Sequence, residues 1–160
     1  MTKLLTLAAM IALPAVAAVA QAPAASTYVT KAGAGDQYEI QSSRLLLTST
    51  KNAKLRSFAS MMVTDHTKST ADVKAAAMRA GLHPAPPKLD AMGTKNVAAL
   101  RAATGTARDR LYVEQQKSAH QRALTLHQTY AQSGTAAPLK TVAASIAPVV
   151  QTHITELSTM

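Results

Sequence analysis

The chain carries small and apolar residues at helical spacing in several long stretches. In the clearest of these, one helical face is formed by Leu55, Ala59, Met62, Ser69, Val73, Ala76 and Ala80. His66 lies on the same face, four residues after Met62. This stretch predicts a long amphipathic helix whose buried face contains a histidine.

Three other long stretches and one shorter stretch repeat the pattern. The predicted helices cover residues 27–50, 53–80, 88–103, 106–132 and 136–160. We expect Ser26 and Asn52 to cap the first two helices, and Gly81 to follow the end of the second. The prolines between residues 84 and 87 cannot continue a helix, and Pro148 should kink the last one.

The order of these elements predicts an all-α fold. No stretch alternates apolar and polar residues for long enough to suggest a strand. Short links after the first and third long helices predict two antiparallel hairpins. We therefore expect an up-down four-helix bundle of the ferritin-like type, with a short extra helix between the two hairpins. Gly33 and Gly35 weaken the first helix and would let a neighbouring helix approach it closely.

Residues 1–20 have the pattern of a secretory signal peptide. A positive start at Lys3 precedes the apolar stretch Leu4–Leu13, and Ala18-Val19-Ala20 is a cleavage motif. The stretch is too short for a spanning helix, and no later segment is long and apolar enough to be one. We expect residues 21–26 to be a flexible leader and residues 27–160 to be one domain in the periplasm, or otherwise exported.

The composition narrows the classes of partner. Seventeen Lys and Arg face eight Asp and Glu, which gives a formal net charge of +9. A basic surface favours an anionic envelope partner such as lipid headgroups or acidic polysaccharide. Nucleic acid is disfavoured because the basic residues are scattered and the chain has one Phe and no Trp to stack on bases. The absence of Cys excludes disulfides and thiolate chemistry.

Four polar residues lie on predicted buried faces. Glu39 and His66 are at similar distances from the first hairpin turn, and His120 and His153 are at similar distances from the second. At 1.5 Å per residue all four fall near the middle of the bundle. One carboxylate and three imidazoles in a helical core are a donor set for a transition metal. The alternative is that these residues only hydrogen-bond one another, with no ion bound.

Other candidate ligands fit less well. Asp65 points away from the face of His66, so we expect it to lie at the surface or to support the site from outside. Met61, Met62 and Met78 point in different directions on their helix, which favours core packing over copper binding. His83 should be solvated in the proline-rich loop, and His127 should lie toward the end of the bundle.

Several stretches of the sequence together carry a family resemblance. Tyr28–Glu39, Phe58–Lys68 with its Met-Val-Thr-Asp-His-Thr-Lys run, Asp109–Tyr112 with His120, and Pro148 with His153 resemble an exported bacterial family of ferritin-like domains of unknown function. Its members are often named as outer membrane proteins. The resemblance covers the whole predicted domain and implies the fold and the export. It implies no activity.

Two functional classes stay open. The first is a non-catalytic envelope or stress-related protein, which is favoured because only one inward carboxylate supports a metal site and packing alone explains the methionines. The sequence contains none of the common hydrolase or nucleotide-binding motifs, so those mechanisms have no support. The second is a mononuclear transition-metal protein, such as a sensor, a scavenger or a weak redox protein. Di-iron chemistry is disfavoured because Val63 and Val150 stand where Glu-x-x-His motifs need carboxylates, and Glu39 is the only carboxylate expected to face inward.

Overall fold

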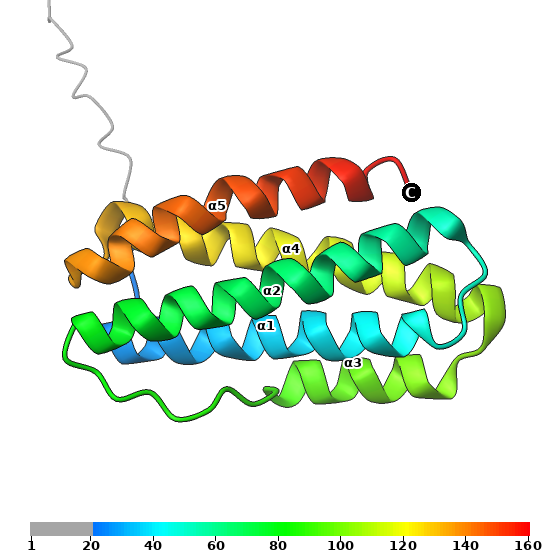
Figure 1. Cartoon of the computed structure of the whole chain (residues 1–160), viewed down its shortest axis with the longest axis horizontal. Coiled ribbons are helices and arrows are strands. Elements are labelled where there is room, and N and C mark those ends of the chain that lie inside the picture. The colour runs from blue at the N-terminus through cyan, green and yellow to red at the C-terminus, as the bar shows by residue number, and fades with distance from the viewer. Residues whose placement is uncertain (1–20) are drawn as a thin grey trace, which may run out of the picture.

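The computed structural model describes residues 21–160, so the predicted signal peptide lies outside the described residues. Residues 21–160 form five helices and no strand (Figure 1), which confirms the all-α prediction for this part of the chain. The helices are α1 Ala25–Leu47, α2 Ala53–Arg79, α3 Ala91–Ala102, α4 Gly105–Ser133 and α5 Ala137–Leu157. None of them is long and apolar enough to cross a bilayer.

The four long helices lie side by side, and each contacts two of the others. α1 packs against α2 and α4, while α5 packs against α4 and α2. The short turns from α1 to α2 and from α4 to α5 make each of these pairs antiparallel (Figure 1). α3 covers the outside of α1 and α4. The longer connection from α2 to α3 runs beside α1 (Figure 1).

The features predicted for the two ends of α2 are both present. The Asn52 side chain accepts a hydrogen bond from the backbone N–H of Leu55 at 3.2 Å, which caps the start of α2. Gly81 follows the end of α2 with φ of +76°, a conformation that glycine adopts without steric cost. The N–H groups of Gly81 and Leu82 bond to the carbonyls of Met78 and Ala77, so the last turn of α2 is satisfied.

Two local predictions differ from the structure. Ser26 does not cap α1, because the helix begins at Ala25 and its cap residue, Ala24, has no side-chain hydrogen bond. The close approach expected at Gly33 involves the α2–α3 connection rather than a helix, since a Cβ on Gly33 would lie 2.8 Å from Cβ of Pro87. α5 continues as one helix through Pro148.

The core consists of two apolar clusters separated by a polar layer. One cluster lies around the start of α1, the end of α2, the end of α4 and the start of α5, with Tyr28, Val73 and Leu139 among its members. The other lies around the opposite ends of these helices and includes Leu46 and Phe58. Buried polar residues from the middle of the helices lie between them: Asp36, Glu39, Ser42, Ser43, His66, Ser69, Gln116, His120 and His153.

His127 belongs to the first apolar cluster rather than to the polar layer. Its side chain is buried, and its Nδ1 forms a hydrogen bond of 3.0 Å with the Tyr28 hydroxyl. The Tyr28 ring stacks on Tyr130 with centroids 4.0 Å apart. Burial lowers the pKa of His127 to about 4, so the imidazole is neutral and can accept this hydrogen bond.

Protonation of His127 should make folding stability pH-dependent. The unfolded imidazole takes up a proton below about pH 6.5, whereas the folded one resists until its pKa of about 4. This contribution to stability is complete above the unfolded pKa and is lost as the pH falls toward the folded one. The loss should approach about 3 kcal/mol.

The matched variant is His127→Gln, which keeps a hydrogen-bond acceptor for Tyr28 but cannot titrate. Urea unfolding at neutral pH and at a pH near 4.5 should show a smaller acid destabilisation for the variant than for the parent protein. An equal loss of stability in both proteins would contradict a neutral, buried His127.

Candidate metal centre

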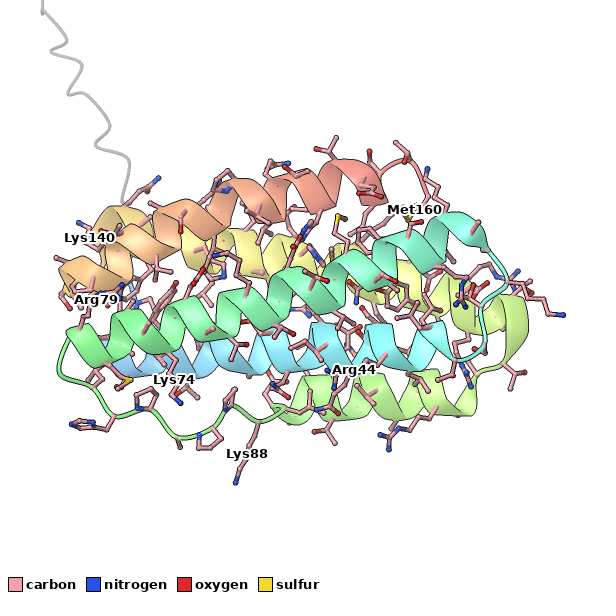
Figure 2. All side chains as sticks on the ribbon, viewed as in Figure 1. Arg44, Lys74, Arg79, Lys88, Lys140 and Met160 are labelled. Carbon is pink, nitrogen blue, oxygen red and sulfur yellow. The ribbon has the colours of Figure 1, made fainter. Side chains whose placement is uncertain are left out.

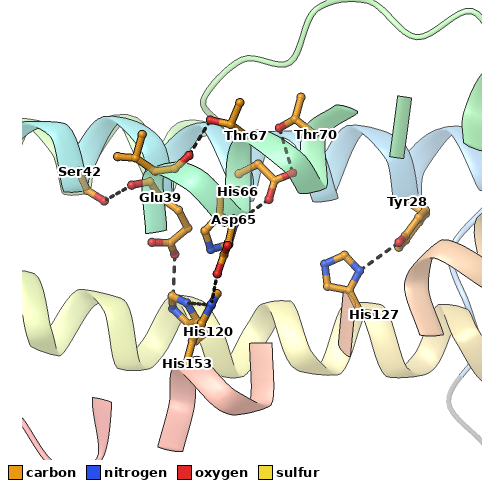
Figure 3. Close-up of polar contacts among 12 residues, drawn as sticks. Tyr28, Glu39, Ser42, Asp65, His66, Thr67, Thr70, His120, His127 and His153 are labelled. Carbon is orange, nitrogen blue, oxygen red and sulfur yellow. Dashed lines mark hydrogen bonds and ion pairs between the residues drawn. The ribbon is translucent and has the colours of Figure 1, made fainter. Parts of the chain in front are cut away.

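Three histidines from three helices meet in the polar layer. His66 comes from α2, His120 from α4 and His153 from α5, and their exposed fractions are 6%, 1% and 1%. One imidazole nitrogen from each lies within 4.8 Å of the corresponding nitrogens of the other two. Figure 3 shows the rings of His120 and His153 side by side, with His66 facing them. The structure therefore brings together the three predicted histidines.

Each ring is held by a hydrogen bond from one of its nitrogens to an oxygen acceptor. Nδ1 of His66 donates to Asp36 Oδ1 at 2.8 Å, and Nε2 of His153 donates to Asp65 Oδ2 at 3.0 Å. Nδ1 of His120 donates to the backbone carbonyl of Gln116 at 3.0 Å. Oxygen acceptors of this kind fix the tautomer of a metal-binding imidazole and increase its basicity.

These outer hydrogen bonds leave lone pairs on the nitrogens that face one another. In the neutral tautomers, Nε2 of His120 and Nδ1 of His153 both lack a proton, yet they lie 3.3 Å apart. Nε2 of His66 is buried and has no hydrogen-bond partner. Two imidazole nitrogens bound tetrahedrally to one zinc ion are about 3.3–3.4 Å apart, given Zn–N bonds of roughly 2.0–2.1 Å. A cation between these rings would satisfy all three nitrogens.

Glu39 lies beside this cluster but is not part of its closest group. Its Oε1 is 3.6 Å from Nδ1 of His120, which is the ring nitrogen directed away from His153 (Figure 3). Its Oε2 is buried without a hydrogen-bond partner. A buried carboxylate oxygen in this condition loses hydration without compensation, so Glu39 has an unfilled capacity to bind a cation.

The pKa shifts follow from burial and from the neighbouring charges. Burial, together with His66 and His153, lowers the pKa of His120 to about 3. Burial also lowers the pKa of His153, although the hydrogen bond to Asp65 opposes this shift. Burial would lower the pKa of His66 as well, but the hydrogen bond and charge of Asp36, together with the charges of Glu39 and Asp65, outweigh it, so that pKa is raised. Burial raises the pKa of Glu39 to about 7.

Apolar and polar neighbours enclose the cluster. The ring of Phe58, a member of the second apolar cluster, lies 6.3 Å from the rings of both His120 and His153, measured between centroids. Gln116 donates from Nε2 to the Ser42 hydroxyl at 3.1 Å, while its Oε1 is buried without a partner. The site is therefore shielded from solvent, and several of its polar atoms remain unsatisfied.

Asp36 is the residue that the sequence analysis missed. Glu39 was expected to be the only inward carboxylate, yet Asp36 is also buried and accepts hydrogen bonds from both His66 and Thr70. Its position three residues before Glu39 places it on the same helical face, and this spacing was the available signal. Asp65 lies partly at the surface and bonds to His153 from outside the cluster, as the sequence predicted.

The remaining sequence candidates lie away from the cluster. His83 is exposed in the connection between α2 and α3, as expected. Met62 is fully buried in the second apolar cluster, whereas Met78 is 57% exposed. The two thioethers therefore occupy different environments and do not form a common copper site.

Comparisons with known proteins identify a family and nothing closer. No curated protein and no solved structure matches the chain. The family described as "Domain of unknown function (DUF4142)" matches residues 12–160, which is almost the whole chain. The chain, with its five helices and its histidine cluster, therefore belongs to the family of DUF4142 domains of unknown function.

Proposed function

We propose that this protein binds a single transition-metal ion through His66, His120 and His153, with Glu39 as a fourth ligand. The observation that carries the proposal is the convergence of three buried imidazole nitrogens whose opposite nitrogens are already engaged. To bind the ion, Glu39 would have to turn from its present position beside His120. Three imidazoles and one carboxylate form a set of four ligands suited to Zn²⁺, Cu²⁺ or Fe²⁺.

The charge of the cluster supports a bound cation. Asp36, Glu39 and Asp65 contact the three rings, and none of them forms an ion pair with Lys or Arg in residues 21–160. Because burial keeps His120 and His153 neutral, only the His66 ring has a raised pKa. A divalent ion offsets this excess of carboxyl groups better than one imidazolium does.

The burial of the ligands favours an ion-holding role over catalysis. All three histidines are almost completely buried, and Phe58 covers one side of the rings. A catalytic metal keeps an open coordination position that substrate can reach, whereas a closed set of protein ligands retains its ion. We therefore favour a scavenger or sensor, and we place a single ion there because Glu39 is the one carboxylate free to bridge.

We also propose a bundle type and a cellular location for the protein. Two antiparallel hairpins that pack on each other support a ferritin-like four-helix bundle with α3 as an addition. The signal-peptide pattern of residues 1–20 supports export to the periplasm, where a non-catalytic envelope role and an anionic partner remain predictions.

N-terminal sequencing of the protein from the producing cell should give a sequence that begins at Gln21, and a start at Met1 would exclude cleavage.

The direct test is metal binding by ligand and control variants. We expect the metal-free protein to bind Zn²⁺ with an increase in melting temperature. His66→Ala should lose at least the roughly 10–100-fold in affinity that removing an outer partner costs, whereas His83→Ala should bind like the parent. Calorimetric titration and thermal melts, supported by elemental analysis of tag-free protein, measure these differences.

The same experiment can exclude the proposal. If the parent gains no thermal stability from Zn²⁺, Cu²⁺, Fe²⁺ or Mn²⁺, the histidines only hydrogen-bond to their neighbours. If His66→Ala and His83→Ala respond equally, the ion binds elsewhere on the protein.

The carboxylates of Asp36 and Asp65, which hold two of the histidine rings from outside, should affect metal affinity nearly as strongly as the ligands do. Asp36→Asn and Asp65→Asn keep the shape of the side chain but remove the charge that strengthens His66 and His153. Each should weaken Zn²⁺ binding by roughly 10–100-fold. Asp72→Asn is the matched control, because Asp72 lies on α2 but pairs only with the exposed Lys68. Equal affinities across the three variants would show that the outer carboxylates play no part.

Metal affinity should depend on pH. A bound ion needs an ionised Glu39 and an unprotonated Nε2 on His66, and the metal-free fold raises the pKa of both groups. Affinity should therefore rise with pH and fall steeply as the pH drops through about 7. Zn²⁺ titrations across this range should show a shallower dependence for Glu39→Gln, which carries no titrating proton. The same slope in both proteins would remove Glu39 from the ligand set.

A further inference from the structure

A groove lies between the α2–α3 connection and the helices α1 and α2. The groove has a volume of about 690 Å³, within the range of small-molecule pockets. Val29, Ala34 and Val73 line it from the helices, and Leu82, Pro86 and Leu89 line it from the connection. Figure 2 shows Lys74 on α2 and Lys88 on the connection along this side of the molecule.

The wall formed by the connection is fixed at three points. The Gly81 turn determines where the chain leaves α2, and the Asp90 side chain caps α3 through a 2.6 Å bond to the N–H of Gly93. Between them, Pro87 packs directly on Gly33, where any larger residue would collide with it. The groove is therefore present before a ligand arrives, which limits the conformational entropy lost on binding.

The polar groups that line the groove are mostly engaged within the protein. The hydroxyl of Thr70 donates to Asp36, that of Thr30 donates to the carbonyl of Ser26, and Asp90 is occupied by its cap. Lys74 and Lys88 are different, because neither pairs with a carboxylate within the part of the chain that the structure describes. The lining of the groove thus combines apolar side chains with two lysines that have no carboxylate partner among the described residues.

We propose that this groove binds a small amphipathic carboxylate. The apolar tail lies against Val29, Val73 and Leu82, and the carboxylate pairs with Lys74 and Lys88. Charge complementarity selects an anion over a neutral or cationic head, because the one acidic lining residue is committed to the start of α3. The site is separate from the histidine cluster and needs no metal ion.

Decanoate is the probe, and the experiment uses the metal-free full chain. Calorimetric titration below the micellar concentration should show saturable binding of decanoate and weaker binding of decanamide, which has the same tail without a charge. The double variant Lys74→Gln/Lys88→Gln should bind decanoate about 3- to 10-fold more weakly, which is the size of effect that two exposed ion pairs supply.

Lys140→Gln is the matched control, since Lys140 is an equally basic residue on α5 whose ammonium contacts the end of α4 instead of the groove. It should bind decanoate like the parent. Equal binding of decanoate and decanamide, no saturable binding of decanoate, or equal losses in the Lys140 and Lys74/Lys88 variants would each overturn the proposal. Because no metal is present, failure here leaves the metal-centre proposal standing.

Discussion

The structure depends on placing ionisable groups in the middle of an apolar core. Asp36, Glu39 and the three clustered histidines are almost fully buried, in a layer between two apolar clusters. Burial of unpaired charge costs several kcal/mol per group, so the cluster persists only because its members bond one another. Asp36 and Asp65 meet this requirement for two of the rings, and the backbone carbonyl of Gln116 meets it for the third.

The hydrogen bonds that offset the cost of burial are complete on the outside of the histidine cluster and incomplete within it. Nε2 of His66 and Oε2 of Glu39 remain unpaired, and two unprotonated nitrogens face each other across 3.3 Å. Well-packed apolar residues would often be as stable as a buried polar cluster of this size. The proposed metal ion would resolve the unpaired atoms together. Its proposed ligands come from all four long helices, so its binding would also hold those helices in register.

Helical spacing predicted the five helices and the three histidines that meet in the core, because it reports which residues share a face. Residue preferences at helix ends predicted the cap at Asn52 and the Gly81 turn. Neither signal gave contacts that depend on how side chains bond across helices. The role of Asp36 was missed because its partners, His66 and Thr70, lie on another helix. The groove was missed because the sequence shows the prolines as a helix break, not as a wall packed on Gly33.

X-ray absorption spectroscopy of the zinc-loaded protein is the sharpest test of the three-histidine site, because it reports the atoms around the ion. A site formed by the three histidines and Glu39 should give four nitrogen or oxygen neighbours at roughly 2.0–2.1 Å, with the outer-shell scattering of about three imidazole rings. A zinc ion with six oxygen neighbours and no imidazole scattering would place the metal on the surface. That result would leave the three histidines without a metal-binding role.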